Sequence, residues 1–161
     1  MRISFGKHKG EDSRALAVKD PSYVVWALDE GSTSGPLAAL ARVLREHLRA
    51  FDAKLFTARC SGDGCTRPVV QATGYVGLNG ELGMYLDFWC EGCDPHGGGA
   101  VPGRLWLIGK YSDFLHLLRN SKSTQADGQR LMKQLAKAKG LGRLTEAALD
   151  AFFSVLAPAA K

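Results

Sequence analysis

Two short turns hold the four cysteines of this 161-residue chain: Cys60-Ser61-Gly62-Asp63-Gly64-Cys65 and Cys90-Glu91-Gly92-Cys93. The two pairs are separated by 24 residues. Zn²⁺ prefers four tetrahedral ligands, and cysteine turns at the ends of β-hairpins supply them without long-range strain. Glycines within the turns let the backbone bend tightly around sulfur. The pattern therefore predicts a zinc-ribbon-like segment over residues 58–108.

The same cysteines allow other arrangements. Two disulfides would use all four thiols, but disulfides are disfavoured in a protein expected in the cytosol. Four unrelated buried thiols are a second alternative, and His96, three positions after Cys93, is an alternative ligand. We expect Cys60, Cys65, Cys90 and Cys93 to bind one Zn²⁺. Because four thiolates close the coordination shell, this metal would be structural rather than catalytic.

Helical patterns flank the cysteine segment on both sides. Apolar residues recur every three or four positions from Leu37 to Leu55, which predicts a long amphipathic helix that begins at Ser34-Gly35-Pro36. Asp20 followed by Pro21 is a start signal for a helix that ends near Gly31. Later helices are expected over residues 112–118, 124–139 and 145–156.

Short β-prone runs predict strands over residues 69–76, 84–89 and 104–108, with Asn79-Gly80 as a hairpin turn. Residues 3–10 are expected to form a short strand that runs into a glycine-bounded turn. The predicted fold class is α+β, with a small antiparallel zinc-ribbon-like sheet packed against about five helices. The segments 1–57, 58–108 and 109–161 are expected to form one compact unit.

The composition is that of a folded protein, with 45% hydrophobic and 23% charged residues. No apolar run approaches the roughly 20 residues that a membrane-spanning helix needs. Charged residues near the N-terminus also interrupt any signal peptide. These features predict a cytoplasmic protein without a membrane partner.

Positive charge is concentrated towards the C-terminus. The formal net charge is +5, and residues 119–143 hold seven cations against the single carboxylate of Asp127. On a helix that starts near Thr124, the cationic side chains gather opposite an apolar face. A phosphate backbone would follow such a stripe, whereas the alternative is an ordinary solvated helix exterior. The predicted nucleic-acid contacts in this segment are Arg130, Lys133, Lys137, Lys139 and Arg143.

A second basic element lies at Phe5-Gly6-Lys7-His8-Lys9-Gly10. Glycine lets backbone N–H groups approach an anion, and the two lysines add electrostatic attraction, so Lys7, His8 and Lys9 are predicted phosphate contacts. The alternative is a hairpin with solvated lysines.

Residues 3–28 resemble the small domain at the C-terminal end of exodeoxyribonuclease X and related bacterial and phage proteins. The resemblance rests on the Phe5-Gly6-Lys7 turn, followed by Asp20, Tyr23 and Trp26 on the next helix. It implies nucleic-acid transactions, with a nuclease or helicase as partner, but it does not imply catalysis. Tyr23 and Trp26 would form a stacking surface or, alternatively, part of the core.

Together these features predict a non-catalytic, zinc-containing nucleic-acid-binding accessory protein in bacterial or phage repair, recombination or replication, with DNA favoured over RNA. One alternative is a metal-dependent nuclease that resembles the His-Asn-His class, in which His96 activates water and His116 or Asn120 helps hold the metal. The other is a zinc-ribbon interaction module whose basic surface meets an acidic protein. Self-association into a homo-oligomer stays open.

Overall fold

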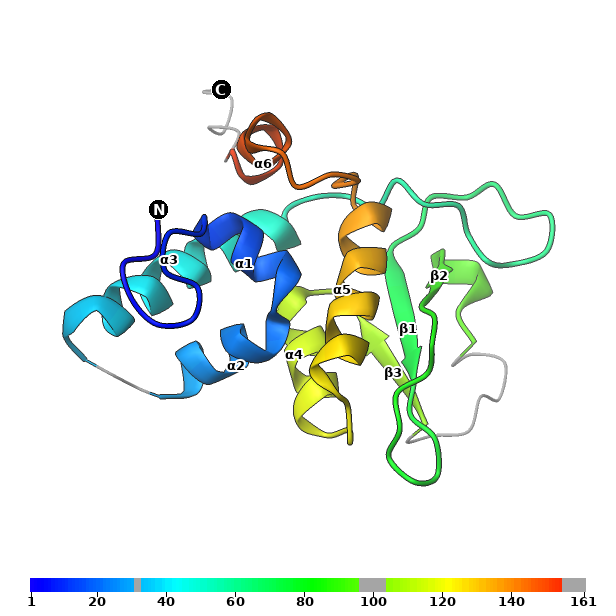
Figure 1. Ribbon diagram of the computed structural model, residues 1–161. Helices are drawn as coiled ribbons and strands as arrows, with labels where there is room; N and C mark the ends of the chain where they lie inside the picture. The colour runs from blue at the N-terminus through cyan, green and yellow to red at the C-terminus, as the bar shows by residue number, and fades with distance from the viewer. Residues whose placement is uncertain (31–32, 96–103, 155–161) are drawn as a thin grey trace.

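Six α-helices and a three-stranded antiparallel sheet make up the described part of the computed structural model, residues 1–30, 33–95 and 104–154 (Figure 1). This arrangement confirms the predicted α+β class. The helices are α1 (Ser13–Lys19), α2 (Pro21–Asp29), α3 (Gly35–Asp52), α4 (Tyr111–Arg119), α5 (Gln125–Ala138) and α6 (Glu146–Phe153). The strands are β1 (Gln71–Tyr75), β2 (Asp87–Trp89) and β3 (Leu105–Ile108), and a 3₁₀ turn, η1 (Glu91–Cys93), follows β2.

Side-chain caps fix the starts of the helices. Asp20 accepts a hydrogen bond from the backbone N–H of Tyr23, with Pro21 at the first position of α2. Thr124 and Asp127 form a reciprocal capping box at the start of α5, and Thr145 caps α6. Such caps satisfy backbone donors that have no partner within the helix. They confirm the helix starts that the sequence predicts at these positions.

The N-terminal segment agrees with its prediction in part. The glycine-bounded turn forms over residues 5–10, but the short strand expected before it is reduced to an isolated bridge between Arg2 and Asp12. Gly6 and Gly10 both have positive φ angles, 65° and 87°, which bend the chain out of an extended conformation. Asp12 then caps α1, a short helix that brings the described helices to six rather than about five.

The sheet has the order β2-β1-β3, and both pairings are antiparallel. Its strands are shorter than the sequence predicts. One face packs on α4, because a Cβ atom at Gly74 would lie only 2.8 Å from Leu117. The Asn79-Gly80 turn is confirmed: the Gly80 N–H donates to the carbonyl of Gly77, and Val76 bridges to Leu82.

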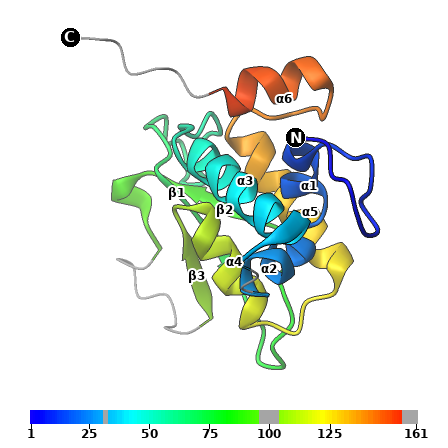
Figure 2. The same ribbon diagram turned by 90° about the vertical axis from the view of Figure 1, so that its left-hand side faces the viewer.

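One apolar core joins the helices to the inner face of the sheet. Its members come from all parts of the chain and include Leu16, Leu44, Phe51, Ala72, Ile108, Phe114 and Leu131. In Figure 2, α4 lies between the sheet and the N-terminal helices, and it contacts β3, α2 and α3. A much smaller cluster of Cys60, Val69 and Cys90 lies beside the cysteine turns. None of the described helices combines the length and hydropathy needed to cross a bilayer.

Candidate metal centre and basic surface

The four cysteine sulfurs converge beside one end of the sheet. Cys60 and Cys65 belong to the loop before β1, while Cys90 and Cys93 flank the turn that follows β2. Their Sγ atoms all lie within 4.8 Å of one another, with 3.7 Å between those of Cys65 and Cys90. A tetrahedron of sulfurs bound to zinc at about 2.3 Å has edges of about 3.8 Å. The four thiols are free, and they lie close enough to bind one metal ion.

Backbone and side-chain donors surround these sulfurs. The N–H groups of Gly62 and Cys90 each lie 3.4 Å from Cys60 Sγ, and they lower the pKa of that thiol. The backbone and guanidinium of Arg67 lower the pKa of Cys65 to about 6. The neighbouring sulfurs of Cys90 and Cys65 instead raise the pKa of Cys93 to about 11. Four sulfurs this close cannot all be thiolates unless a cation neutralises them, which suits a divalent metal.

Arg67 is a site residue that the sequence analysis missed. It donates to Cys93 Sγ at 3.5 Å, and its guanidinium lies against Gly92, where a Cβ atom would overlap it. A site of four thiolates and one divalent ion carries a net negative charge, so a nearby arginine balances it. The signal in the sequence is a cation two positions after Cys65.

Gly62 provides a direct test of this geometry. A Cβ atom at Gly62 would lie 2.6 Å from Cys93 Sγ, so Gly62→Ala must displace a ligand. We expect metal affinity to fall by about ten- to hundredfold, measured by competition with a chromophoric chelator. Gly142→Ala is the control, because a Cβ atom there meets no atom within 4 Å. An unchanged affinity in the Gly62 variant would contradict the assigned ligand set.

Of the two histidines of the nuclease alternative, the structure describes His116, and it does not lie at this centre. His96 lies outside the described residues. His116 is exposed on α4, where its ring contacts Trp106 at 5.2 Å between centroids and lies beside the amide of Asn120. Within residues 1–30, 33–95 and 104–154, the group of metal-binding side chains close enough to share an ion is the four cysteines.

In the N-terminal turn, Lys7 and His8 already pair with carboxylates of this chain. Lys7 Nζ lies 2.8 Å from Asp20, whose side chain is buried. The two ring nitrogens of His8 lie 3.1 Å from Glu11 and 3.1 Å from Asp20. This arrangement leaves neither nitrogen of His8 for a phosphate. Lys9 is exposed and forms no ion pair with a described residue.

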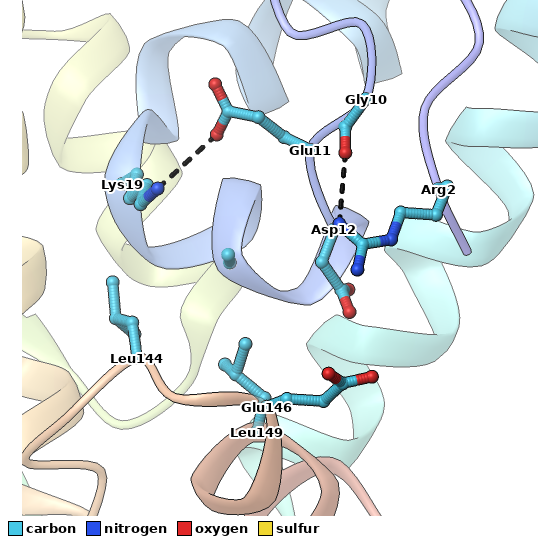
Figure 3. A pocket seen from close by; sticks show the side chains of 9 residues that line it. Arg2, Gly10, Glu11, Asp12, Lys19, Leu144, Glu146 and Leu149 are labelled. Atoms are coloured by element: carbon cyan, nitrogen blue, oxygen red, sulfur yellow. Dashed lines mark hydrogen bonds and ion pairs between the residues drawn. The ribbon is translucent and has the colours of Figure 1, made fainter.

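The surface next to this turn is also rich in carboxylates. Figure 3 shows a hollow between the turn, α1 and the start of α6, with the side chains of Glu11, Asp12 and Glu146 around it. Its two cations are engaged, since Lys19 pairs with Glu11 at 3.5 Å and Arg2 donates to the Gly10 carbonyl at 3.2 Å. Three carboxylates against two cations do not favour a polyanion.

Helix α5 presents Lys133 and Lys137 to solvent, with the half-buried Arg130 one turn before Lys133. Arg130 donates to the carbonyl of Met84 at 3.3 Å and pairs with Asp127 at 2.9 Å. Lys133 and Lys137 are exposed, one helical turn apart, and neither forms an ion pair with any described residue. Lys137 also lines a hollow between α5, Phe88 and residues 57–58. Arg143 is exposed in the loop that leads to α6.

Lys139 corrects the sequence prediction, because its side chain is 5% exposed. Its ammonium donates to the carbonyl of Lys54 at 2.7 Å and lies 4.4 Å from the centroid of the Phe56 ring. Burial lowers the pKa of this group. The long aliphatic chain is buried while the charge has a carbonyl and aromatic faces as partners. Lys139 therefore holds the end of α5 against the residues that follow α3, and it cannot contact a nucleic acid.

No protein-family model, curated protein or solved structure matches this chain. The resemblance of residues 3–28 to the exodeoxyribonuclease X module stays a prediction from the sequence. The residues that carry this resemblance contact one another. The carboxylate of Asp20 hydrogen-bonds the ring of His8 in the turn. The centroid of the Tyr23 ring lies 4.7 Å from that of His8 and 4.8 Å from that of Trp26. These contacts give the motif a role in packing the turn on α2.

Proposed function

We propose that this protein binds nucleic acid through the exposed face of α5, with the four cysteines holding a structural Zn²⁺. The observation that carries the binding proposal is the pair Lys133 and Lys137, which are exposed, close together and unpaired within the described residues. Arg130 extends the same stripe. Uncompensated cations spaced along a helix match the repeating charge of a phosphate backbone.

The choice of zinc follows from the chemistry of the donors. Four thiolates are soft ligands, and tetrahedral sites of this composition hold Zn²⁺ in structural modules. Among the residues that the structure describes, the buried members of the second apolar cluster are Cys60, Val69 and Cys90, which is too small a core to order residues 58–70 by itself. Zinc would supply that order, since the binding energy of a structural metal is folding energy.

The finer parts of the proposal rest on the sequence resemblance. It favours DNA over RNA and an accessory role beside a nuclease or helicase in the cytoplasm of bacteria or in phage replication. The turn at Lys7 contributes less than the sequence suggests, because Asp20 neutralises part of its charge. The principal contacts in this proposal are therefore Arg130, Lys133, Lys137 and the exposed Arg143.

A salt titration tests the binding surface. Replacing Lys133 and Lys137 with alanine should weaken DNA binding and reduce the slope of log K against log salt by about two. Fluorescence anisotropy of a labelled duplex measures both quantities. The matched control is Arg42→Ala with Arg45→Ala, which removes two exposed cations from α3. Helices α1 and α2 pack against both α3 and α5, so the two arginines on α3 lie on a different surface from Lys133 and Lys137 on α5.

Two outcomes would reject the proposed function. The first is the absence of DNA and RNA binding by the zinc-loaded protein at low salt. The second is an equal loss of binding in the α3 control, because the effect would then report total charge and not the stripe on α5.

A further inference from the structure

The outer face of the sheet carries large side chains that remain exposed. Successive side chains of a strand alternate between faces, so Thr73 and Tyr75 lie opposite the face that Gly74 turns to α4. The register places Asp87 and Leu107 beside Thr73, and Leu105 beside Tyr75. Tyr75 is 45% exposed and Leu107 is 41% exposed. Thr73 itself is buried, at 3% exposed. The surface formed by these residues is hereafter called the outer sheet face.

Two further aromatic residues belong to the outer sheet face. The indole N–H of Trp89 donates to the hydroxyl of Thr73 at 2.8 Å, which holds the ring against the sheet. Before β2, Leu86 is buried against the core, so its neighbour Tyr85 points outward and is 71% exposed. The β1–β2 register shifts beyond Asp87: Val76 bridges to Leu82, and the Gly83 N–H donates to the carbonyl of Tyr75 at 2.7 Å. Gly83 therefore lies beside Tyr75, and Tyr85 follows it two positions later along the chain.

The basic stripe of α5 borders this face. The amide of Gln134 donates to the carbonyl of Met84 at 3.0 Å and accepts from the N–H of Leu86 at 2.9 Å, while Arg130 also donates to Met84. The segment that carries Tyr85 is therefore fixed to α5 at Arg130 and Gln134, on the helix that also carries Lys133 and Lys137. Cations along one border and aromatic rings on the adjoining face match a strand with phosphates on one side and unpaired bases on the other.

We infer that the protein binds single-stranded nucleic acid, with phosphates along the α5 stripe and bases stacked on Tyr85 and Tyr75. This inference rests on the proposed function and specifies its ligand. A duplex keeps its bases stacked internally, so it would use the lysines but gain nothing from the tyrosines. Asp87 is exposed on the same face, and its charge would keep phosphates on the α5 side.

The test compares a labelled oligothymidine with a duplex of equal length, using the zinc-loaded full chain. Tyr85→Ala should weaken oligothymidine binding at least about fivefold, leave duplex binding unchanged and preserve the salt slope. Tyr85→Phe keeps the ring and should retain the affinity. Leu55→Ala is the control, since it removes an exposed apolar side chain that follows α3 and lies outside the sheet.

The outcomes separate this inference from the proposed function. Equal binding of both ligands with no effect of Tyr85→Ala would overturn the inference and leave the α5 surface in place. Binding of neither ligand would overturn both. A dimer that Tyr85→Ala converts to monomer, measured by light scattering, would show that a second copy of the chain covers the outer sheet face and would also overturn the inference.

Discussion

Replacing Cys90 with serine is expected to remove the metal and unfold the region around the cysteine turns. Cys90 is buried in the smaller apolar cluster, and serine cannot replace a thiolate ligand in such a centre. The lost binding energy should lower the melting temperature by more than about 10 °C. Elemental analysis should find one zinc per chain in the parent protein and none in the variant.

Hydrogen exchange would show where the variant loses order. Amides of β1 and β2 should lose protection, whereas those of α1 and α3 belong to the main core and should keep most of theirs. The matched control is Thr66→Ser, which alters the exposed neighbour of Cys65 by one methyl group. A Cys90 variant as stable as the parent, or a parent that purifies without zinc, would refute the structural role of the metal.

Replacing Asp20 with alanine is expected to produce the second large effect. Its side chain is 2% exposed, and its carboxylate accepts hydrogen bonds from Lys7, His8, Gln125 and the backbone of Tyr23. Alanine would leave these donors without an acceptor and would remove the cap of α2. We expect a loss of about 3 kcal/mol in the free energy of unfolding, measured by urea denaturation.

The control for Asp20 is Asp29→Ala. Asp29 pairs with Arg119 at 2.6 Å, but the two side chains are 53% and 38% exposed, so the loss should stay below about 1 kcal/mol. If the two variants lose similar amounts of unfolding free energy, the buried hydrogen bonds of Asp20 contribute no more to stability than an exposed ion pair, and the prediction is wrong.

The same carboxylate predicts a dependence on pH. Burial alone would raise the pKa of Asp20, but hydrogen bonds from Lys7, Tyr23 and His8 outweigh it, so the pKa is lowered. A lowered pKa contributes stability above the ordinary value of about 3.9, and this contribution is lost as the pH falls through the folded-state pKa. Asp20→Asn keeps a capping oxygen and should therefore show a shallower loss of stability below about pH 4 than the parent protein.

Local signals in the sequence predict much of the fold. Helix starts at Asp20, Thr124 and Thr145 follow from residues that cap their own backbone, so no distant contact is needed to recognise them. The convergence of the cysteines is also predictable, because few other arrangements satisfy four thiols at this spacing. The fold class follows from these elements together with the short β-prone runs.

The predictions that were wrong concern residues whose partners lie in distant segments of the chain. Lys139 has the spacing of a surface lysine, yet its partner is the carbonyl of Lys54, 85 positions away along the chain. The phosphate role expected of His8 depends on Asp20, which lies 12 positions later and accepts a hydrogen bond from Gln125 as well. Charge patterns along a sequence do not show which cations are neutralised in the folded state.

The side chain of Gln134 has a consequence for how copies of this protein meet one another. Its amide donates to the carbonyl of Met84 and accepts from the N–H of Leu86. Two residues further along, the Ser61 hydroxyl accepts from the N–H of Phe88, and the Ser61 N–H donates to the carbonyl of Phe88. These groups would otherwise form a free hydrogen-bonding rim beyond β2. Because that rim is already paired, it cannot template a β-strand from another molecule, which protects the β2 edge of the sheet against edge-to-edge aggregation.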